Sequence, residues 1–166
     1  MSKTREYTLR GKPIAVQELL DVVAVAADQA GGLRPLDAED VTRASPGLSR
    51  PAVEAFRDAG WVFVRATDPT PGPVAKVFVK PGGRPALATN RLSAKVADSL
   101  SEAETQALLA RHGARIVGRL KFAPGLYQVE VEPPAGKDVL DIAAELTAEP
   151  AVEFAEPELL EVIAQR

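Results

Sequence analysis

The stretch between residues 92 and 154 limits the possible folds most strongly, because strand and helix patterns follow one another there without interruption. Apolar and polar residues alternate from 92 to 96, as in a strand with one buried face. Ser101 and Glu104 have the spacing of a capping box and predict the start of a helix. Gly113 supplies the residue that ends such a helix.

The pattern continues with a predicted hairpin, a second helix and a final strand. The alternating stretches 115–120 and 127–131 flank residues 122–125, where Pro followed by Gly suits a type II turn. Apolar residues at helical spacing from 139 to 146 predict the helix, and residues 152–154 predict the strand.

The resulting order is strand, helix, strand, strand, helix, strand, which is the ferredoxin-like βαββαβ plan. The predicted fold class is therefore α+β, with an antiparallel sheet, two helices on one face, and a smaller α+β region before it. The opposite face of the sheet is left open. If Val152 and Phe154 are buried, the residues of the open face are Ser93, Lys95, Arg115, Val117, Arg119, Leu126, Gln128, Glu130, Glu153 and Ala155.

Residues 1–88 are divided into short pieces by glycine and proline, and no role follows from them. The expected pieces are a small hairpin within 7–16, a helix that starts at Ser49 or Arg50 and ends before Gly60, strands at 61–64 and 75–80, and a stiff connection at 67–74.

Composition removes several classes of function. The 20 Lys and Arg residues against 23 Asp and Glu give a net charge of -3, which argues against a nucleic-acid or membrane partner. The absence of cysteine excludes disulfides, thiolate metal sites and a cysteine nucleophile. The first 12 residues are polar, and Glu18 and Asp21 interrupt the apolar stretch that follows, so neither a signal peptide nor a membrane span is expected.

The sequence offers little for catalysis. His112 is the single histidine and stands at the predicted end of a helix, where we expect its ring to bond terminal carbonyls rather than act as a base. The acidic residues at 153, 156, 158 and 161 are interpreted as a solvated edge rather than a cation site. We therefore expect no enzyme activity, no metal and no cofactor.

The segment Glu156–Arg166, EPELLEVIAQR, is apolar and has no place in a four-stranded sheet. It either packs against the N-terminal half of its own chain or is added as a strand to a partner. The sequence leaves both alternatives open.

Three stretches carry a resemblance to a known family: LSAKVADSLSEAETQALLARHGARIVGRL, GLYQVEVEPP and AAELTAEPAVEFAEPE. Together they resemble the propeptide, or inhibitor, domain of subtilisin-like serine proteases, of the fervidolysin type. The resemblance covers Leu92 to Glu158, and VEFAEPE is its most specific part. No motif of a protease catalytic triad is present, so the chain is not expected to hydrolyse peptides.

The resemblance implies a partner and a set of binding residues. Such domains press the open sheet face onto two surface helices of the protease, act as folding chaperones, and lead their C-terminal segment through the substrate groove as product-like inhibitors. By the match of VEFAEPE, Glu156 and Glu158 correspond to the two carboxylates that cap those helices. The residues expected in the groove are Val162, Ile163, Ala164, Gln165 and Arg166, with either Ala164 or Arg166 in the specificity pocket.

The sequence thus predicts an N-terminal region at 1–88, a propeptide-like domain at 89–158 and an inhibitory tail at 159–166. The expected location is the cytoplasm as synthesised, with export alongside the protease left open. The alternative from another class is a ferredoxin-like regulatory or dimerisation module that binds a small ligand through the open face.

Overall fold

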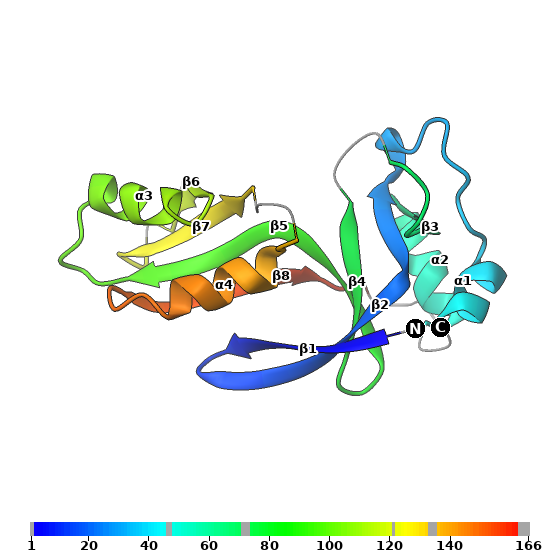
Figure 1. Cartoon of the computed structure of the whole chain (residues 1–166), viewed down its shortest axis with the longest axis horizontal. Coiled ribbons are helices and arrows are strands. Elements are labelled where there is room, and N and C mark those ends of the chain that lie inside the picture. The colour runs from blue at the N-terminus through cyan, green and yellow to red at the C-terminus, as the bar shows by residue number, and fades with distance from the viewer. Residues whose placement is uncertain (1, 46–47, 71–73, 121, 133–135, 163–166) are drawn as a thin grey trace. The chain divides into compact units, whose positions relative to one another are not determined.

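The computed structural model describes residues 2–45, 48–70, 74–120, 122–132 and 136–162 (Figure 1). Within these ranges the chain is a mixed α+β protein with eight strands, four α-helices and one 3-10 helix. In chain order the elements are β1 (Ser2–Leu9), β2 (Lys12–Ala26), η1 (Ala27–Gln29), α1 (Ala38–Ala44), α2 (Arg50–Asp58), β3 (Trp61–Arg65), β4 (Ala75–Lys80), β5 (Arg84–Val96), α3 (Glu102–Ala110), β6 (Ala114–Arg119), β7 (Leu126–Val131), α4 (Val139–Thr147) and β8 (Val152–Leu160).

Hydrogen bonds connect the described strands in the order β1-β2-β4-β5-β7-β6, and β3 pairs with β2 while β8 pairs with β5. The sequence predicted a sheet of four strands, whereas the described sheet has eight. Two long strands explain the difference. β5 begins at Arg84 rather than Leu92 and pairs with β4 before it pairs with β7.

β2 is the other long strand, and its interrupting charge is neutralised by neighbouring residues. Glu18 is 7% exposed, and its carboxylate forms ion pairs with Arg5 of β1 and Lys76 of β4. A buried carboxylate is tolerated when it is paired with cations, so Glu18 does not end the strand. The polar residue that seemed to break the apolar stretch joins three strands instead.

The chain divides into two compact units. The first comprises Met1–Arg5, Ala15–Ala88 and Leu159–Arg166, and the second comprises Glu6–Ile14 and Thr89–Glu158. The first part of β5 belongs to the first unit and the rest of it to the second. The tip of the β1–β2 hairpin groups with the second unit, and the segment after Glu158 groups with the first.

The first unit has its own apolar core. Phe56 of α2 meets Phe63 of β3 edge to face, with ring centroids 5.9 Å apart. The prediction of α2 is confirmed: Ser49 caps the helix by accepting from the Ala52 amide, and the helix ends before Gly60. Strands β3 and β4 also lie where the sequence predicts them, while part of the connection expected at 67–74 falls outside the described residues.

The N-terminal hairpin is longer than the sequence pattern suggested. Its turn is formed by Arg10 and Gly11, whose φ angles are 51° and 77°. Two successive residues with positive φ are typical of the two-residue turns that suit the twist of paired strands. The register of the hairpin is set there.

In the second unit the predicted caps are present. Ser101 accepts from the Glu104 amide, and the Glu104 carboxylate accepts from the Ser101 amide, so the predicted capping box of α3 is confirmed. Helix α4 begins with a second such box, between Asp138 and Asp141, which was not predicted. Figure 1 shows both helices beside the strands of this unit.

Strand β8 differs from its prediction in length and in parity. It runs to Leu160 and includes the buried Pro157. Among the described strands β8 pairs with β5 alone, and an edge strand tolerates a proline because it has ladder positions that need no amide donor. Ala155, expected on the open face, is 2% exposed, whereas Phe154, expected in the core, is half-buried.

Burial in β8 does not follow one face of the strand. Val152 and Ala155 are both buried, although residues three apart lie on opposite faces of a regular strand. The parity rule used for the prediction therefore does not hold for this strand.

Membrane-spanning helices are not found in the described residues, since no helix there is long and apolar enough.

Candidate functional site

The open face of the second unit presents a mixed polar surface. Along β5 the residues Leu92, Ala94 and Val96 are buried, while Ser93 and Lys95 between them are half-buried. This alternation leaves one face of the sheet uncovered by the unit's own core. With the exception of Ala155, the predicted open-face residues in the described strands are half-buried or exposed. Arg119 was nevertheless assigned to the wrong face, because a register shift between Ile116 and Gly118 places it across from the buried Tyr127.

Glu130 is the electrostatic centre of that face. Its carboxylate on β7 lies 2.6 Å from Arg115 on β6 and 3.8 Å from Arg91 on β5. The register places each arginine directly across from Glu130. The hydrogen bond and the charge of Arg115 hold the pKa of Glu130 below its ordinary value. At neutral pH Arg91, Glu130 and Arg115 therefore form a row of ion pairs across three strands, which we call the ionic ladder.

The two predicted carboxylates of β8 have different surroundings. Glu156 Oε1 accepts a hydrogen bond of 2.9 Å from the backbone N–H of Arg10, in the turn of the N-terminal hairpin. In the described part of the chain Glu158 has no hydrogen-bond or ion-pair partner, and it is half-buried. One carboxylate is thus already bonded to a backbone amide within the chain, and the other is available.

The residues after β8 return to the first unit. Glu161 lies 3.5 Å from Lys80 Nζ and 3.9 Å from Arg84 Nε. Val162 is half-buried and packs against the core of that unit. The sequence left open whether this segment packs on its own chain or on a partner. In the structure Glu161 and Val162 pack on their own chain. The other expected groove residues, Ile163, Ala164, Gln165 and Arg166, lie outside the described part of the chain.

His112 does not cap its own helix as predicted. Its Nδ1 lies 3.2 Å from Glu145 and its Nε2 lies 2.8 Å from Glu149, both on α4. The carboxylates of a neighbouring helix are stronger acceptors than the terminal carbonyls of α3, which explains the choice. His112 joins two helices, and both of its ring nitrogens are engaged in doing so.

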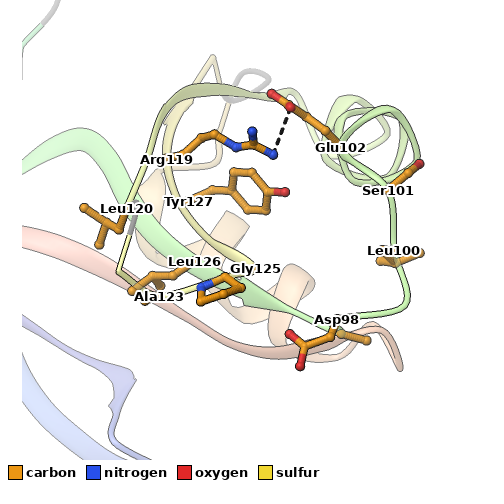
Figure 2. Close-up of a pocket in the computed structure, with 12 residues that line it drawn as sticks. Asp98, Leu100, Ser101, Glu102, Arg119, Leu120, Ala123, Gly125, Leu126 and Tyr127 are labelled. Carbon is orange, nitrogen blue, oxygen red and sulfur yellow. Dashed lines mark ion pairs between the residues drawn. The ribbon is translucent and has the colours of Figure 1, made fainter.

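A pocket of about 550 Å³, which the sequence did not predict, lies at the turn end of the β6–β7 hairpin (Figure 2). The start of α3 forms one side of it and the turn at Ala123–Gly125 forms another. Figure 2 shows Arg119 beside the Tyr127 ring and paired with Glu102. The Arg119 Cζ atom lies 5.9 Å from the ring centroid, and the guanidinium lies 3.0 Å from the Glu102 carboxylate. The capping box and the Pro-Gly turn were both predicted, but nothing in the sequence indicated that they meet.

The described residues contain no cluster of three or more His, Asp or Glu side chains that could hold a metal ion.

Comparison with known families finds a similarity that covers most of the second unit. The family model that matches is the fervidolysin N-terminal prodomain, over residues 80–158. The resemblance to a subtilisin-type propeptide domain is thereby confirmed for this segment, and the match begins earlier than the residues that carried the resemblance, at the end of β4. No curated protein and no solved structure shows a significant match to the chain.

Proposed function

We propose that this chain is a prodomain-type inhibitor and folding chaperone of a subtilisin-like serine protease. The observation that carries the proposal is the match of residues 80–158 to the fervidolysin prodomain family. A prodomain is a regulatory rather than a catalytic domain, which agrees with a histidine whose ring nitrogens are both bonded to helix α4. The partner proposed is therefore the protease, with no nucleic acid and no membrane.

The proposed core of the interaction is a ferredoxin-like unit within the larger sheet. Its elements follow the order β5-α3-β6-β7-α4-β8, and its strands pair in the order β8-β5-β7-β6. In this proposal the open face, with the ionic ladder around Glu130, packs against two surface helices of the protease. Because Glu130 is already paired with Arg91 and Arg115, docking of this face would not bury an unpaired carboxylate.

Glu156 and Glu158 are proposed to cap the N-termini of those two helices. The bond from the Arg10 amide supports this role, because it shows that a backbone N–H can reach the Glu156 carboxylate. A carboxylate at a helix N-terminus accepts from unpaired amides and opposes the positive end of the helix dipole. Glu158 has the same chemistry and, among the described residues, no partner to give up.

The segment after β8 is proposed to enter the substrate cleft as an added strand. The segment continues directly from β8, which is extended up to Leu160. Extension of β8 into the cleft would need no change of backbone conformation before that residue.

Inhibition kinetics test the proposal. The chain is first used to capture its protease from an extract of the source organism, and the captured enzyme is then assayed with a peptide substrate. We expect an inhibition constant in the nanomolar range, and deletion of residues 161–166 should raise it at least tenfold. Refolding of the denatured protease should be faster when the chain is present. Failure to inhibit any captured serine protease would contradict the proposal.

A small-ligand module remains the second candidate, and the pocket beside Tyr127 is the observation in its favour. Its volume of about 550 Å³ falls in the range of ligand sites. This candidate predicts a ligand-dependent rise in melting temperature and no effect on any protease.

A further inference from the structure

A pair of cations on the β4–β5 hairpin holds the segment that follows β8. Lys80 ends β4 and Arg84 begins β5, and the two residues are partners across the antiparallel ladder. Lys80 Nζ lies 3.5 Å from Glu161 Oε2, and Arg84 Nε lies 3.9 Å from Glu161 Oε1. Each oxygen of the carboxylate therefore faces its own cation.

The position of Lys80 makes this contact more than a surface ion pair. Its side chain is 15% exposed, so its charge is largely shielded from water and salt. The turn between the two cations contains Gly82 and Gly83, both with positive φ, which allows the tight connection. The two charges are consequently held by a ladder and a turn that exist whether or not Glu161 is bound.

Val162 adds an apolar contact next to the ionic one. It packs against the core cluster of the first unit, to which β4 contributes Val77 and β5 contributes Leu87. Glu161 is thus bound by the two cations, and Val162, the next residue, packs on the apolar surface beside them. The chemistry defines a receptor for an extended acidic–apolar segment.

We infer that the Lys80–Arg84 hairpin and the adjoining core form an intramolecular receptor for Glu161 and Val162 and compete with the protease cleft for that segment. The identity of the competitor rests on the proposed function, whereas the receptor is a property of the free chain. Glu156 is held in the same state by the Arg10 amide. The free chain is therefore a restrained inhibitor, and its potency rises when the receptor is lost.

Thiol labelling tests the receptor without any protease. The chain has no cysteine, so Val162→Cys introduces a single thiol whose reaction with a maleimide reports its accessibility. On this background Lys80→Ala/Arg84→Ala should raise the labelling rate at least threefold. The control Arg34→Ala/Arg57→Ala removes the same charge from two exposed residues of the same unit and should leave the rate unchanged.

A second variant covers the case in which the double alanine variant does not fold. Glu161→Gln leaves the two cations of the receptor in place and should also raise the labelling rate, because it removes the charge that they pair with. Equal labelling rates in a folded receptor variant and in its control would overturn the inference.

The competition is tested separately by inhibition. The Lys80→Ala/Arg84→Ala chain should inhibit the captured protease at least threefold more tightly than the parent chain. Equal inhibition constants together with faster labelling would overturn the competition. If the parent chain inhibits no protease, the proposed function fails, and the labelling experiment still decides whether the receptor exists.

Discussion

Two glutamates on one strand show how far a single side chain's surroundings decide its role. Glu156 and Glu158 both point from β8, yet the first accepts from a hairpin amide and the second has no partner among the described residues. The resemblance to the propeptide family gave them one shared role. Only the structure distinguishes the carboxylate that already accepts from a backbone amide from the one without a partner in the described residues.

Replacing either glutamate by alanine should weaken inhibition without unfolding the chain. Glu158→Ala removes a helix cap worth on the order of 1 kcal/mol, so we expect about a fivefold higher inhibition constant. Glu156→Ala should weaken inhibition less, because binding no longer has to break the bond to Arg10. The control is Glu54→Ala on α2, which should not change the constant. Unchanged inhibition by Glu158→Ala would contradict the capping role.

Gly125 is the turn residue with the least room for substitution. Its φ is 79°, and a Cβ there would lie 2.8 Å from the Val96 carbonyl oxygen, a backbone atom that cannot move aside. Gly125→Ala should therefore lower the free energy of unfolding by about 1–3 kcal/mol, measured by urea denaturation. Gly32→Ala is the matched control, since Gly32 has a similar φ of 83° and a Cβ there meets nothing within 4 Å. Equal losses in the two variants would refute the steric argument.

At the scale of elements, side chains from the helices complete the sheet. Gln106 of α3 reaches the outer strand β6, where its Oε1 accepts from the Ile116 amide at 3.0 Å and its Nε2 reaches the Ala114 carbonyl at 3.5 Å. These contacts occupy backbone groups that an edge strand would otherwise offer to another chain. His112 plays a comparable part between the helices by joining the end of α3 to α4.

The helix contact should make stability depend on acid pH. The hydrogen bond from Lys137 and then that from His112 lower the pKa of Glu145, and the hydrogen bond from His112 lowers the pKa of Glu149, from an ordinary value of 4.5. A lowered pKa in the folded state means that the carboxylates stabilise the fold above pH 4.5, and that this contribution is lost as the pH falls through the lowered values.

Unfolding free energies of the parent and of Glu145→Gln/Glu149→Gln, measured from pH 7 to pH 3, test this expectation. The parent should be the more stable chain at neutral pH, and its advantage should shrink below the ordinary carboxyl pKa of 4.5. The control Glu39→Gln/Glu54→Gln should show no such trend. An advantage that stays constant to pH 3 would contradict the assignment.

The sequence predicted those elements whose signals are local. The Ser101–Glu104 capping box, the α2 cap at Ser49 and the strands at 61–64 and 75–80 all depend on neighbouring residues, and the structure contains each of them. The full length of β2 was not predictable, because the ion pairs that allow Glu18 to be buried come from residues distant in sequence. The pocket beside Tyr127 and the Glu161 contacts were missed for the same reason.

For the whole molecule, the connections between N-terminal and C-terminal residues carry the most information about function. Residues 6–14 group with the prodomain-like unit, and the segment after Glu158 groups with the first unit. The N-terminal hairpin thereby contacts Glu156, which lies inside the segment matched by the prodomain family, and Lys80 contacts Glu161, which follows that segment.

Protection of the protease's catalytic serine is the measurement that tests the central claim most directly. A fluorophosphonate probe labels that serine in the captured protease, and a chain seated in the substrate cleft must block the reaction. We predict that one equivalent of the full chain abolishes labelling and that the chain lacking residues 161–166 protects at least tenfold less well. Labelling at an unchanged rate under a saturating excess of the chain would contradict the account.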